Sequence, residues 1–367
     1  MNGKSATLFI NGRFLAHPVF SGVQRFATEV IKSIDRLVDA HVDRAPFHDY
    51  VLLTPCTVRE ALPLRNIRVV RTGRLSGHAW EQIELSLASA NGWLLNLCNG
   101  APITKKRQGV VIHDASVFAI PESFSPAFRA TYKAMLPVLA RRAAALFTVS
   151  EFSRTELSTR LGIERDRLEV VYEGADHLEG VVPDPSILIP NSLVRHGYFL
   201  AVGAESKNKN LGRILGAFRK SCSSEHKVVI TGKRDVSVHG QLKIGLGPGV
   251  VRVGHVTDAQ LKALYQNALA LVYPSTYEGF GLPPVEAMAC GCPVIVGSRA
   301  SLPEICGDAA IMCDSLDEND IARAMRVVSE QPELCDSARR LGLQRAKTFR
   351  WDSTTKRLLA HLGAAHG

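Results

Sequence analysis

Residues 275–293 read STYEGFGLPPVEAMACGCP and place a glycine-rich loop directly before a short helix. Gly279 and Gly281 let backbone N–H groups approach a ligand closely, because glycine has no side chain to block the approach. Pro283 and Pro284 suit the first turn of a helix, where a missing N–H is not needed. A loop that ends in a helix N-terminus predicts a surface that binds anions and hydroxyl groups.

Two glutamates stand in this stretch. Glu278 lies in the loop, and Glu286 lies about one turn inside the helix. Two carboxylates that accept hydrogen bonds from neighbouring hydroxyl groups would form a clamp for a polyol such as a sugar. The alternative is a solvated helix glutamate beside a turn glutamate, and the spacing alone leaves both interpretations open.

Outward from this stretch, short apolar runs alternate with helix-like segments along the chain, which has 367 residues. The alternation predicts a doubly wound α/β architecture with parallel strands. In the second half we expect strands at 198–202, 227–231, 251–253, 270–273 and 293–296, and helices at 211–220, 258–267 and 283–290, with Asp258 as an N-cap. In the first half we expect strands at 6–10, 110–112, 146–149 and 170–172, and helices at 23–37 and 125–139.

The length of the chain predicts two domains. The alternation breaks in the proline-rich stretch VVPDPSILIPNSLVRHG, which has the composition of a linker. We therefore expect one α/β domain over residues 1–185, a second over 186–350, and a closing helix over 351–367. No Gly-x-Gly-x-x-Gly follows a predicted strand, so the sequence does not predict a nicotinamide dinucleotide site.

The chain is basic, with a formal net charge of +9 and a hydrophobic fraction of 46% that is ordinary for a globular protein. The sharpest local excess of charge is a group of eight cations: Arg59, Arg65, Arg68, Arg71, Arg74, Lys105, Lys106 and Arg107. Such a group can meet phosphates, nucleic acid or an anionic membrane surface, or it can simply be solvated. The cations lack interleaved aromatic residues, so a nucleic-acid surface is the weakest of these interpretations.

The eight cysteines include no Cys-x-x-Cys pair, and the first residues carry only a short apolar run. We therefore expect no secretory leader, reduced thiols and a cytoplasmic location. No apolar stretch approaches the roughly 20 residues that span a bilayer. Cys290 and Cys292 flank a predicted helix end without a nearby histidine, and we interpret them as packing residues rather than metal ligands.

The stretch STYEGFGLPPVEAMACGCPVIVGSRASLPEICGDAA resembles the signature of the GT4 family of retaining glycosyltransferases. The segments VIHDASVFAIPESF, TVSEFSRTEL, YFLAVGAESKNKNLGRILGAF and AKTFRWDSTTKRLLAHL resemble further parts of the family. The resemblance runs along most of the chain and is strongest over residues 198–356. It implies the GT-B fold, with two Rossmann-like domains that face a central cleft and a C-terminal helix that crosses back to the first domain. It also implies that the first domain binds the acceptor and the second binds the sugar nucleotide.

The resemblance also implies roles for individual residues. It places His113, Glu278 and Lys209 at catalytic positions near the donor sugar and its diphosphate. It places Gly22, Lys207, Phe280, Gly281, Leu282 and Glu286 at donor-binding positions, with Glu286 on the ribose hydroxyl groups. The backbone amides of Phe280, Gly281 and Leu282 are expected to contact the sugar and the diphosphate. The chain departs from the family at Asn208, where an arginine is common, and at Glu173, where an asparagine is common.

The function that follows is transfer of a hexose from a nucleotide diphosphate sugar to a hydroxyl group of a glycan or lipid-linked acceptor. Features shared with one subgroup favour mannose from GDP-mannose and the synthesis of a surface polysaccharide. No two aspartates stand two apart, so neither a metal nor another cofactor is expected. We also expect peripheral contact with an anionic membrane through the eight-cation group. The alternatives are a sugar-nucleotide epimerase or phosphorylase-like enzyme on the same fold, and a sugar-nucleotide-binding protein without catalysis.

Overall fold

The computed structural model describes residues 7–16, 21–39, 47–60, 62–203, 207–221, 226–232 and 247–366. It divides into two compact units, the first made of Met1–Phe118, Pro126–Gly174 and Trp351–Gly367 and the second of Ala119–Ser125 and Ala175–Arg350. The main boundary therefore lies at Gly174 rather than at the expected residue 185. The physical reason is that Lys262 Nζ donates to the Leu178 and Val181 carbonyls at 2.8 Å each, which holds this part of the linker on the second unit.

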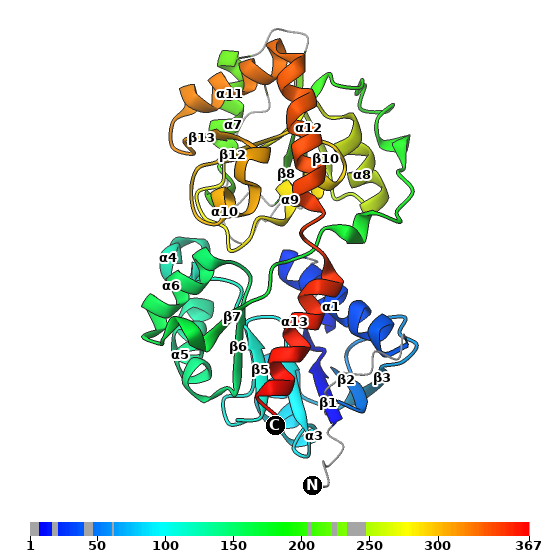
Figure 1. The fold of residues 1–367 in the computed structure, drawn as a ribbon, viewed down its shortest axis with the longest axis vertical. Helices are drawn as coiled ribbons and strands as arrows, with labels where there is room; N and C mark the ends of the chain where they lie inside the picture. Colours follow the sequence, from blue (N-terminus) through cyan, green and yellow to red (C-terminus); the bar gives the residue numbers. More distant parts are fainter. Residues whose placement is uncertain are drawn as a thin grey trace. The chain divides into compact units, whose positions relative to one another are not determined.

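The first unit is built on a seven-stranded parallel sheet (Figure 1). Its strand order is β3-β2-β1-β4-β5-β6-β7, so the direction of winding reverses between β1 and β4. The strands are β1 (Thr7–Asn11), β2 (Asp49–Pro55), β3 (Arg68–Thr72), β4 (Trp93–Asn96), β5 (Gln108–Val111), β6 (Ala145–Thr148) and β7 (Leu168–Val170). All residues of β4, β5 and β6 are buried, as expected for parallel strands covered on both faces.

Helices cover this sheet. They are α1 (Gly22–Asp39), α2 (Gly77–Ala79), a π-helix (Trp80–Leu85), α3 (Ser86–Ala88), α4 (Ser116–Ala119), α5 (Pro126–Arg142), α6 (Glu151–Leu161) and α13 (Trp351–Ala364). The predicted closing helix is α13, and it packs on α1. Trp351 meets the Phe26 ring edge-to-face at 5.8 Å, and Asp352 Oδ1 accepts from Ser33 Oγ at 2.7 Å. The chain therefore returns to its first unit at its end.

The second unit contains a six-stranded parallel sheet in the order β10-β9-β8-β11-β12-β13. This is the order of a doubly wound dinucleotide-binding fold, and its winding reverses between β8 and β11. The strands are β8 (Tyr198–Val202), β9 (Lys227–Thr231), β10 (Val250–Gly254), β11 (Ala270–Tyr273), β12 (Val294–Gly297) and β13 (Ile311–Cys313). The helices are α7 (Leu211–Ser221), α8 (Asp258–Asn267), α9 (Leu282–Ala289), α10 (Leu302–Cys306), α11 (Glu318–Glu330) and α12 (Pro332–Ala346).

The N-cap of α8 is Thr257 rather than the expected Asp258. Thr257 Oγ1 accepts from the Gln260 N–H and Gln260 Oε1 accepts from the Thr257 N–H, both at 3.2 Å. This reciprocal capping box satisfies two backbone donors. Asp258 lies in the first helical turn, where its negative charge interacts favourably with the positive end of the helix dipole.

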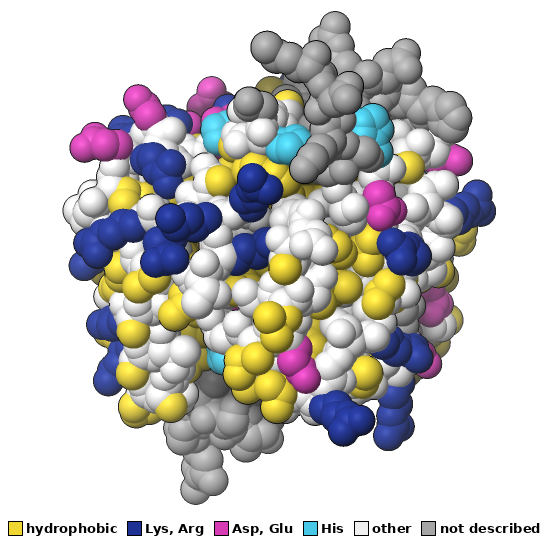
Figure 2. Space-filling model, turned by 90° about the horizontal axis from the view of Figure 1, so that it is seen from below, with side chains coloured by type: hydrophobic (Ala, Val, Ile, Leu, Met, Phe, Trp, Pro, Cys, Tyr) yellow, Lys and Arg dark blue, Asp and Glu magenta, His cyan; other side chains and the backbone are white. Residues whose placement is uncertain are grey.

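The eight-cation group expected from the sequence does not form one patch. Arg68 lies on the edge strand β3, whereas Lys105, Lys106 and Arg107 lie just before β5. Four strand spacings separate β3 from β5, which is about 19 Å across the sheet. Figure 2 shows the lysine and arginine side chains of one face in several separate groups with apolar side chains between them.

No helix among the described residues is both long enough and apolar enough to cross a membrane.

Candidate functional site

The candidate site of the second unit lies where the winding of its sheet reverses. β8 and β11 are neighbours in the sheet, and the chain leaves them toward opposite sides. In open α/β sheets, this point at the carboxyl ends of the strands is where ligands bind. Lys209 follows β8 in a short 3-10 turn, and Glu278 follows β11 in the loop before α9.

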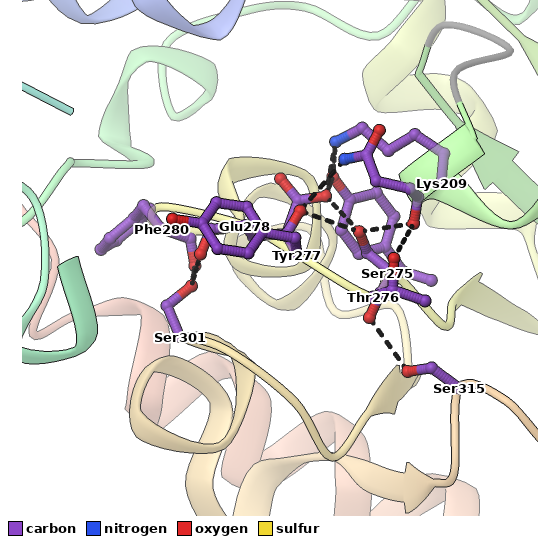
Figure 3. A network of polar contacts seen from close by, with 10 residues as sticks. Lys209, Ser275, Thr276, Tyr277, Glu278, Phe280, Ser301 and Ser315 are labelled. Atoms are coloured by element: carbon purple, nitrogen blue, oxygen red, sulfur yellow. Dashed lines mark hydrogen bonds and ion pairs between the residues drawn. The ribbon is translucent and has the colours of Figure 1, made fainter. Parts of the chain in front are cut away.

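The structure brings Lys209 and Glu278 into direct contact (Figure 3). Lys209 Nζ donates to Glu278 Oε1 at 2.7 Å, and it also contacts the Tyr273 hydroxyl. The same carboxylate oxygen accepts from Tyr273 Oη at 3.0 Å and from Ser275 Oγ at 2.5 Å. The side chains of Lys209 and Glu278 are 22% and 12% exposed, so the pair is partly shielded from water and still reachable by a ligand.

The two segments that carry this pair are also joined through their backbones. The Asn208 carbonyl accepts from the Thr276 N–H at 2.9 Å and lies at the same distance from Ser275 Oγ. In return, Asn208 Nδ2 donates to the Tyr277 carbonyl at 3.0 Å. Asn208 stands where the family commonly has an arginine, and here its side chain fixes the loop that carries Glu278.

The start of α9 presents backbone donors beside this loop. Gly281 is the N-cap with φ of +100°, and a Cβ at this position would lie 2.7 Å from Leu302, so only glycine fits here without strain. Pro283 and Pro284 have no N–H. Of the four N–H groups that a helix start leaves unpaired, those of Gly281 and Leu282 therefore remain. They are two of the three amides expected at the donor.

Phe280 is the third of these residues, and its side chain is only 3% exposed. Its ring meets Phe349 edge-to-face at 5.4 Å, and its carbonyl accepts from Ser301 Oγ at 2.8 Å. Ser301 Oγ also reaches the Glu278 carbonyl at 3.0 Å. Ser301 is thus a second support of this loop, beside Asn208.

Glu286 is buried on α9 and does not join the Lys209 cluster. Its Oε1 lies 3.0 Å from His177 Nε2, and its Oε2 accepts from Tyr265 Oη at 3.0 Å. Burial and the neighbouring Glu286 charge raise the pKa of Tyr265 well above its usual value, so this hydroxyl stays a donor. Neither His177 nor Tyr265 was singled out from the sequence, since they lie on separate elements and only the tertiary fold brings them to Glu286.

Lys207 opens the same 3-10 turn as Lys209 and is exposed. The thiols of Cys290 and Cys292 are shielded, and burial raises the pKa of each to about 12. Among the described residues, no group of three or more His, Cys, Asp or Glu side chains could hold a metal ion.

The remaining expected site residues, His113 and Gly22, lie in the first unit. His113 follows β5 and is 4% exposed, with its Nε2 at 2.9 Å from the Leu97 carbonyl and its Nδ1 at 3.5 Å from Glu173 Oε1. Glu173, the departure from the family pattern, is thus the carboxylate that faces this histidine. Gly22 begins α1, and a Cβ there would meet nothing within 4 Å, so packing does not require a glycine.

Comparison with known proteins identifies the family of this chain. Residues 191–345 match the family model described as glycosyl transferases group 1. The O-antigen chain mannosyltransferase B of Escherichia coli is 32% identical over 266 residues, which cover 69% of each chain. The O-antigen chain mannosyltransferase RfbU of Salmonella typhimurium is 26% identical over 231 residues, which cover 62% of each chain.

Solved structures show the same fold at low identity. HepE of Anabaena, crystallised with UDP and glucose, gives a TM-score of 0.74 at 15% identity and covers 98% of this chain and 100% of its own. Sucrose-phosphate synthase of Thermosynechococcus elongatus gives 0.73 at 17% identity and covers 96% of both chains. The expected pair of Rossmann-like domains of the GT-B type is confirmed.

Proposed function

Because this chain belongs to the glycosyl transferases group 1 and is a glycosyltransferase, we propose that it transfers mannose from GDP-mannose to a hydroxyl group of a glycan or lipid-linked acceptor. The names of two relatives, both O-antigen chain mannosyltransferases, support mannose as the sugar and a surface polysaccharide as the product. The observation that carries the proposal is the contact of Lys209 with Glu278 at the point where the second sheet reverses its winding.

In the proposed reaction, the bond between the anomeric carbon and the diphosphate oxygen breaks, and the acceptor hydroxyl oxygen bonds to the same face of the sugar. The proton of that hydroxyl group passes to the leaving diphosphate oxygen. Negative charge builds on the leaving diphosphate. We propose that Lys209 Nζ and the N–H groups of Gly281 and Leu282 stabilise this charge, because fixed donors aimed at a developing charge lower the activation barrier of the transfer. Lys207, exposed on the same turn, is assigned to the outer side of the diphosphate.

Glu278 is assigned to the donor sugar. The three side-chain donors that the described residues bring to it, from Lys209, Tyr273 and Ser275, all reach Oε1. Its Oε2 is therefore the oxygen assigned to a sugar hydroxyl group. Oε1 has the separate task of fixing the lysine, so we do not assign Glu278 as a covalent nucleophile.

Glu286 is assigned to the ribose hydroxyl groups of the nucleotide. A carboxylate has about four acceptor sites, and His177 and Tyr265 use one on each oxygen. The remaining sites can accept from the two ribose hydroxyl groups without loss of either protein contact. His113, with Glu173 at its Nδ1, is assigned to the donor sugar, and Gly22 to close backbone approach of the diphosphate.

We further propose metal-independent transfer and peripheral contact with an anionic membrane. The contact surface is the part of the cation group that precedes β5. Lys106 and Arg107 are exposed there, whereas the Lys105 ammonium group donates to the Ser89 carbonyl at 2.6 Å. Exposed apolar side chains support this choice, since Ile83, Leu87 and Ile103 are 53%, 72% and 38% exposed. The Ile103 N–H donates to Gln82 at 2.9 Å, and Ser86 contacts Thr104 at 3.3 Å, so these apolar residues lie along one helix and the loop beside it.

The test is a calorimetric titration with GDP-mannose, GDP and UDP-glucose, followed by analysis of the products. The proposal expects tighter binding of GDP-mannose than of UDP-glucose, and mannose transfer that needs an acceptor. Tighter binding of UDP-glucose would contradict GDP-mannose as the donor. Conversion of the donor to an epimer without an acceptor would replace transfer by epimerisation.

A further inference from the structure

A second polar cluster lies at the winding reversal of the first sheet, where β1 and β4 are neighbours. Asn11 ends β1 and Asn96 ends β4, and Asn11 Nδ2 donates to Asn96 Oδ1 at 3.0 Å across this point. The same geometric rule that places the donor site in the second unit marks this point as a ligand site in the first unit. No role assigned above uses these residues.

The cluster is centred on a buried ion pair. Glu81 is 1% exposed and Arg13 is 9% exposed, and Arg13 Nε donates to Glu81 Oε1 at 2.9 Å. Asn11 Nδ2 donates to the same oxygen at 2.9 Å. Glu81 lies in the π-helix Trp80–Leu85, and such wide turns inside helices occur frequently at functional sites.

His78 connects this buried pair to the surface. Its Nδ1 lies 3.2 Å from Glu81 Oε2, and its side chain is 39% exposed although the carboxylate beneath it is covered. Because Nδ1 is engaged with the carboxylate, Nε2 at the far edge of the ring is the atom that can meet a ligand. A buried carboxylate that fixes an exposed imidazole in this way orients a hydrogen-bonding group for a partner.

Aromatic rings adjoin the imidazole. Tyr132 meets the His78 ring edge-to-face at 5.7 Å, and Phe128 stacks on Tyr132 with ring centroids 4.2 Å apart. Phe128 is 40% exposed. Both residues come from the first turns of α5, and α5 ends just before β6 begins, so these turns lie at the carboxyl edge of the sheet.

The loop after β4 joins this cluster to His113. A Cβ on Gly100 would lie 3.0 Å from both Arg13 and Glu81, so a side chain here would press on the ion pair. Three residues earlier, the Leu97 carbonyl lies 2.9 Å from His113 Nε2, and Asn99 Oδ1 accepts from the His113 N–H at 2.7 Å. One short loop therefore contacts His113 and lies against the ion pair beneath His78.

We propose that His78, Tyr132 and Phe128 form a subsite for a neutral sugar ring of the acceptor, with Glu81 and Arg13 as positioning residues. The apolar C–H face of a sugar suits an exposed aromatic ring, and its hydroxyl groups suit His78 Nε2. Arg13 and Glu81 compensate each other's charge, so the cluster favours a neutral ligand over an anion. The inference rests on the proposed function, because only a glycosyltransferase needs an acceptor sugar.

A purely structural role would explain the cluster poorly. Burial of two charges costs several kcal/mol per ion, and a well-packed apolar pair of the same volume is often as stable. A structural ion pair would also not require an exposed histidine or an exposed phenylalanine beside it. The two interpretations differ in what they predict for the Nε2 edge of His78.

The first experiment measures sugar binding without the donor. Saturation-transfer NMR is recorded with the methyl glycosides of mannose, glucose, galactose and N-acetylglucosamine. We expect saturation transfer to at least one of them, and roughly tenfold weaker binding in Phe128→Ala and in His78→Asn. Absence of binding by all four glycosides to the intact protein would overturn the subsite.

The second experiment separates the two edges of the imidazole. Asparagine places its amide near the Nδ1 position and keeps a donor for Glu81, whereas glutamine reaches the Nε2 position. The subsite predicts that His78→Gln keeps more glycoside affinity than His78→Asn, and a purely structural histidine predicts the opposite order. His361→Asn is the matched control, since His361 in α13 also lies beside a carboxylate, Glu169, and an aromatic ring, Phe147.

Donor binding is titrated separately in each variant. We expect unchanged affinity for GDP-mannose when the glycoside signal is lost. Loss of both signals in His78→Gln and His78→Asn alike would mean that the unit is damaged, and the subsite would then be rejected. If the intact protein binds the glycosides but no sugar nucleotide, the proposed function fails while the sugar subsite stands.

Discussion

Lys209 Nζ lies 2.7 Å from Glu278 Oε1, so the cation assigned to the diphosphate is already paired with the carboxylate assigned to the donor sugar. The pair joins the ends of β8 and β11, which are neighbours in the sheet. Without a donor, the carboxylate orients the lysine. In the proposed reaction, the diphosphate is a second anion for the same ammonium group, and the pair is a preformed frame for the leaving group.

Replacing Lys209 by alanine is therefore expected to lower kcat/KM more than it weakens binding of the nucleoside diphosphate. A charge-assisted hydrogen bond is worth about 1.5–3 kcal/mol, and the transition state gains more because charge builds on the leaving group. The measurements are steady-state kinetics with the donor and calorimetry with the product.

Lys207→Ala is the matched control, because it removes the same charge from an exposed position two residues away. Lys207→Ala should lower kcat/KM and weaken binding of the nucleoside diphosphate less than Lys209→Ala does. A larger effect of Lys207→Ala would reverse the two assignments, and unchanged turnover in both variants would place the diphosphate elsewhere.

Replacing Glu286 by glutamine should weaken nucleotide binding by about 1.5–3 kcal/mol, the worth of a hydrogen bond to a charged group. The variant keeps the volume of the buried side chain and one acceptor oxygen, so the second unit should remain folded. Tyr265→Phe, which removes a support of Glu286 without touching the ligand, should have a smaller effect. The affinity for the nucleoside diphosphate is measured by calorimetry. Equal affinity of Glu286→Gln and the native protein would contradict the assignment of Glu286 to the ribose.

Most of the second sheet can be predicted from the sequence because β8, β9, β11 and β12 are almost fully buried. Continuous apolar runs give the bounds of β8 and β11 to the residue. The edge strand β3 reads RVVRT and none of its residues is buried, so it offers no continuous apolar run and the sequence does not predict it. β13 is hidden for another reason, since its three residues are too short for a periodic pattern.

The residues of the candidate site also fall into a group that the sequence predicts and a group that it does not. Lys209 and Glu278 follow predicted strands, so the sequence alone places them at one sheet edge. His177 and Tyr265, which contact Glu286, lie 109 and 21 residues away from it in the chain, so no local sequence pattern predicts these contacts. The pair of Arg13 and Glu81 is hidden for the same reason, because a buried salt bridge between distant segments leaves no periodic signal.

The product should keep the anomeric configuration of the donor, and transfer should continue in chelator. The reason is the family signature together with the absence of two aspartates spaced two apart. Proton NMR of the product and a rate measurement in EDTA are the checks. An inverted product, or activity that is lost in EDTA and restored by Mg²⁺ or Mn²⁺, would contradict this prediction.

Binding to anionic vesicles should depend on the cations before β5. Each basic residue near an anionic surface contributes about 1 kcal/mol, and salt screens the contribution. The double variant Lys106→Gln, Arg107→Gln should therefore be released from phosphatidylserine vesicles in a sedimentation assay. The double variant Arg65→Gln, Arg68→Gln is the control at β3, and equal binding of native protein to neutral and anionic vesicles would leave these cations as a solvated surface.

The stability of the first unit should respond to pH through Glu81. Burial opposes the charge on this carboxylate, but the His78 hydrogen bond, Arg13 and Asn11 together lower its pKa below the usual value. In the unfolded chain a glutamate has a pKa of about 4.3. As the pH falls below that value, the unfolded chain takes up a proton before the folded chain does, so the free energy of unfolding falls until the folded pKa is passed.

The comparison with Glu81→Gln isolates this contribution. At pH 7 the variant should be less stable by about 3–5 kcal/mol, because Arg13 is left buried without its partner. The difference should shrink from about pH 5 downward, as the native protein loses the contribution that the variant lacks. All three tryptophans, Trp80, Trp93 and Trp351, lie in the first unit, so urea unfolding followed by their fluorescence reports on that unit. Glu60→Gln, at an exposed carboxylate, should differ from the native protein by less than about 0.5 kcal/mol at every pH. A Glu81→Gln difference that stays constant down to pH 3 would show that the folded protein holds Glu81 without a lowered pKa.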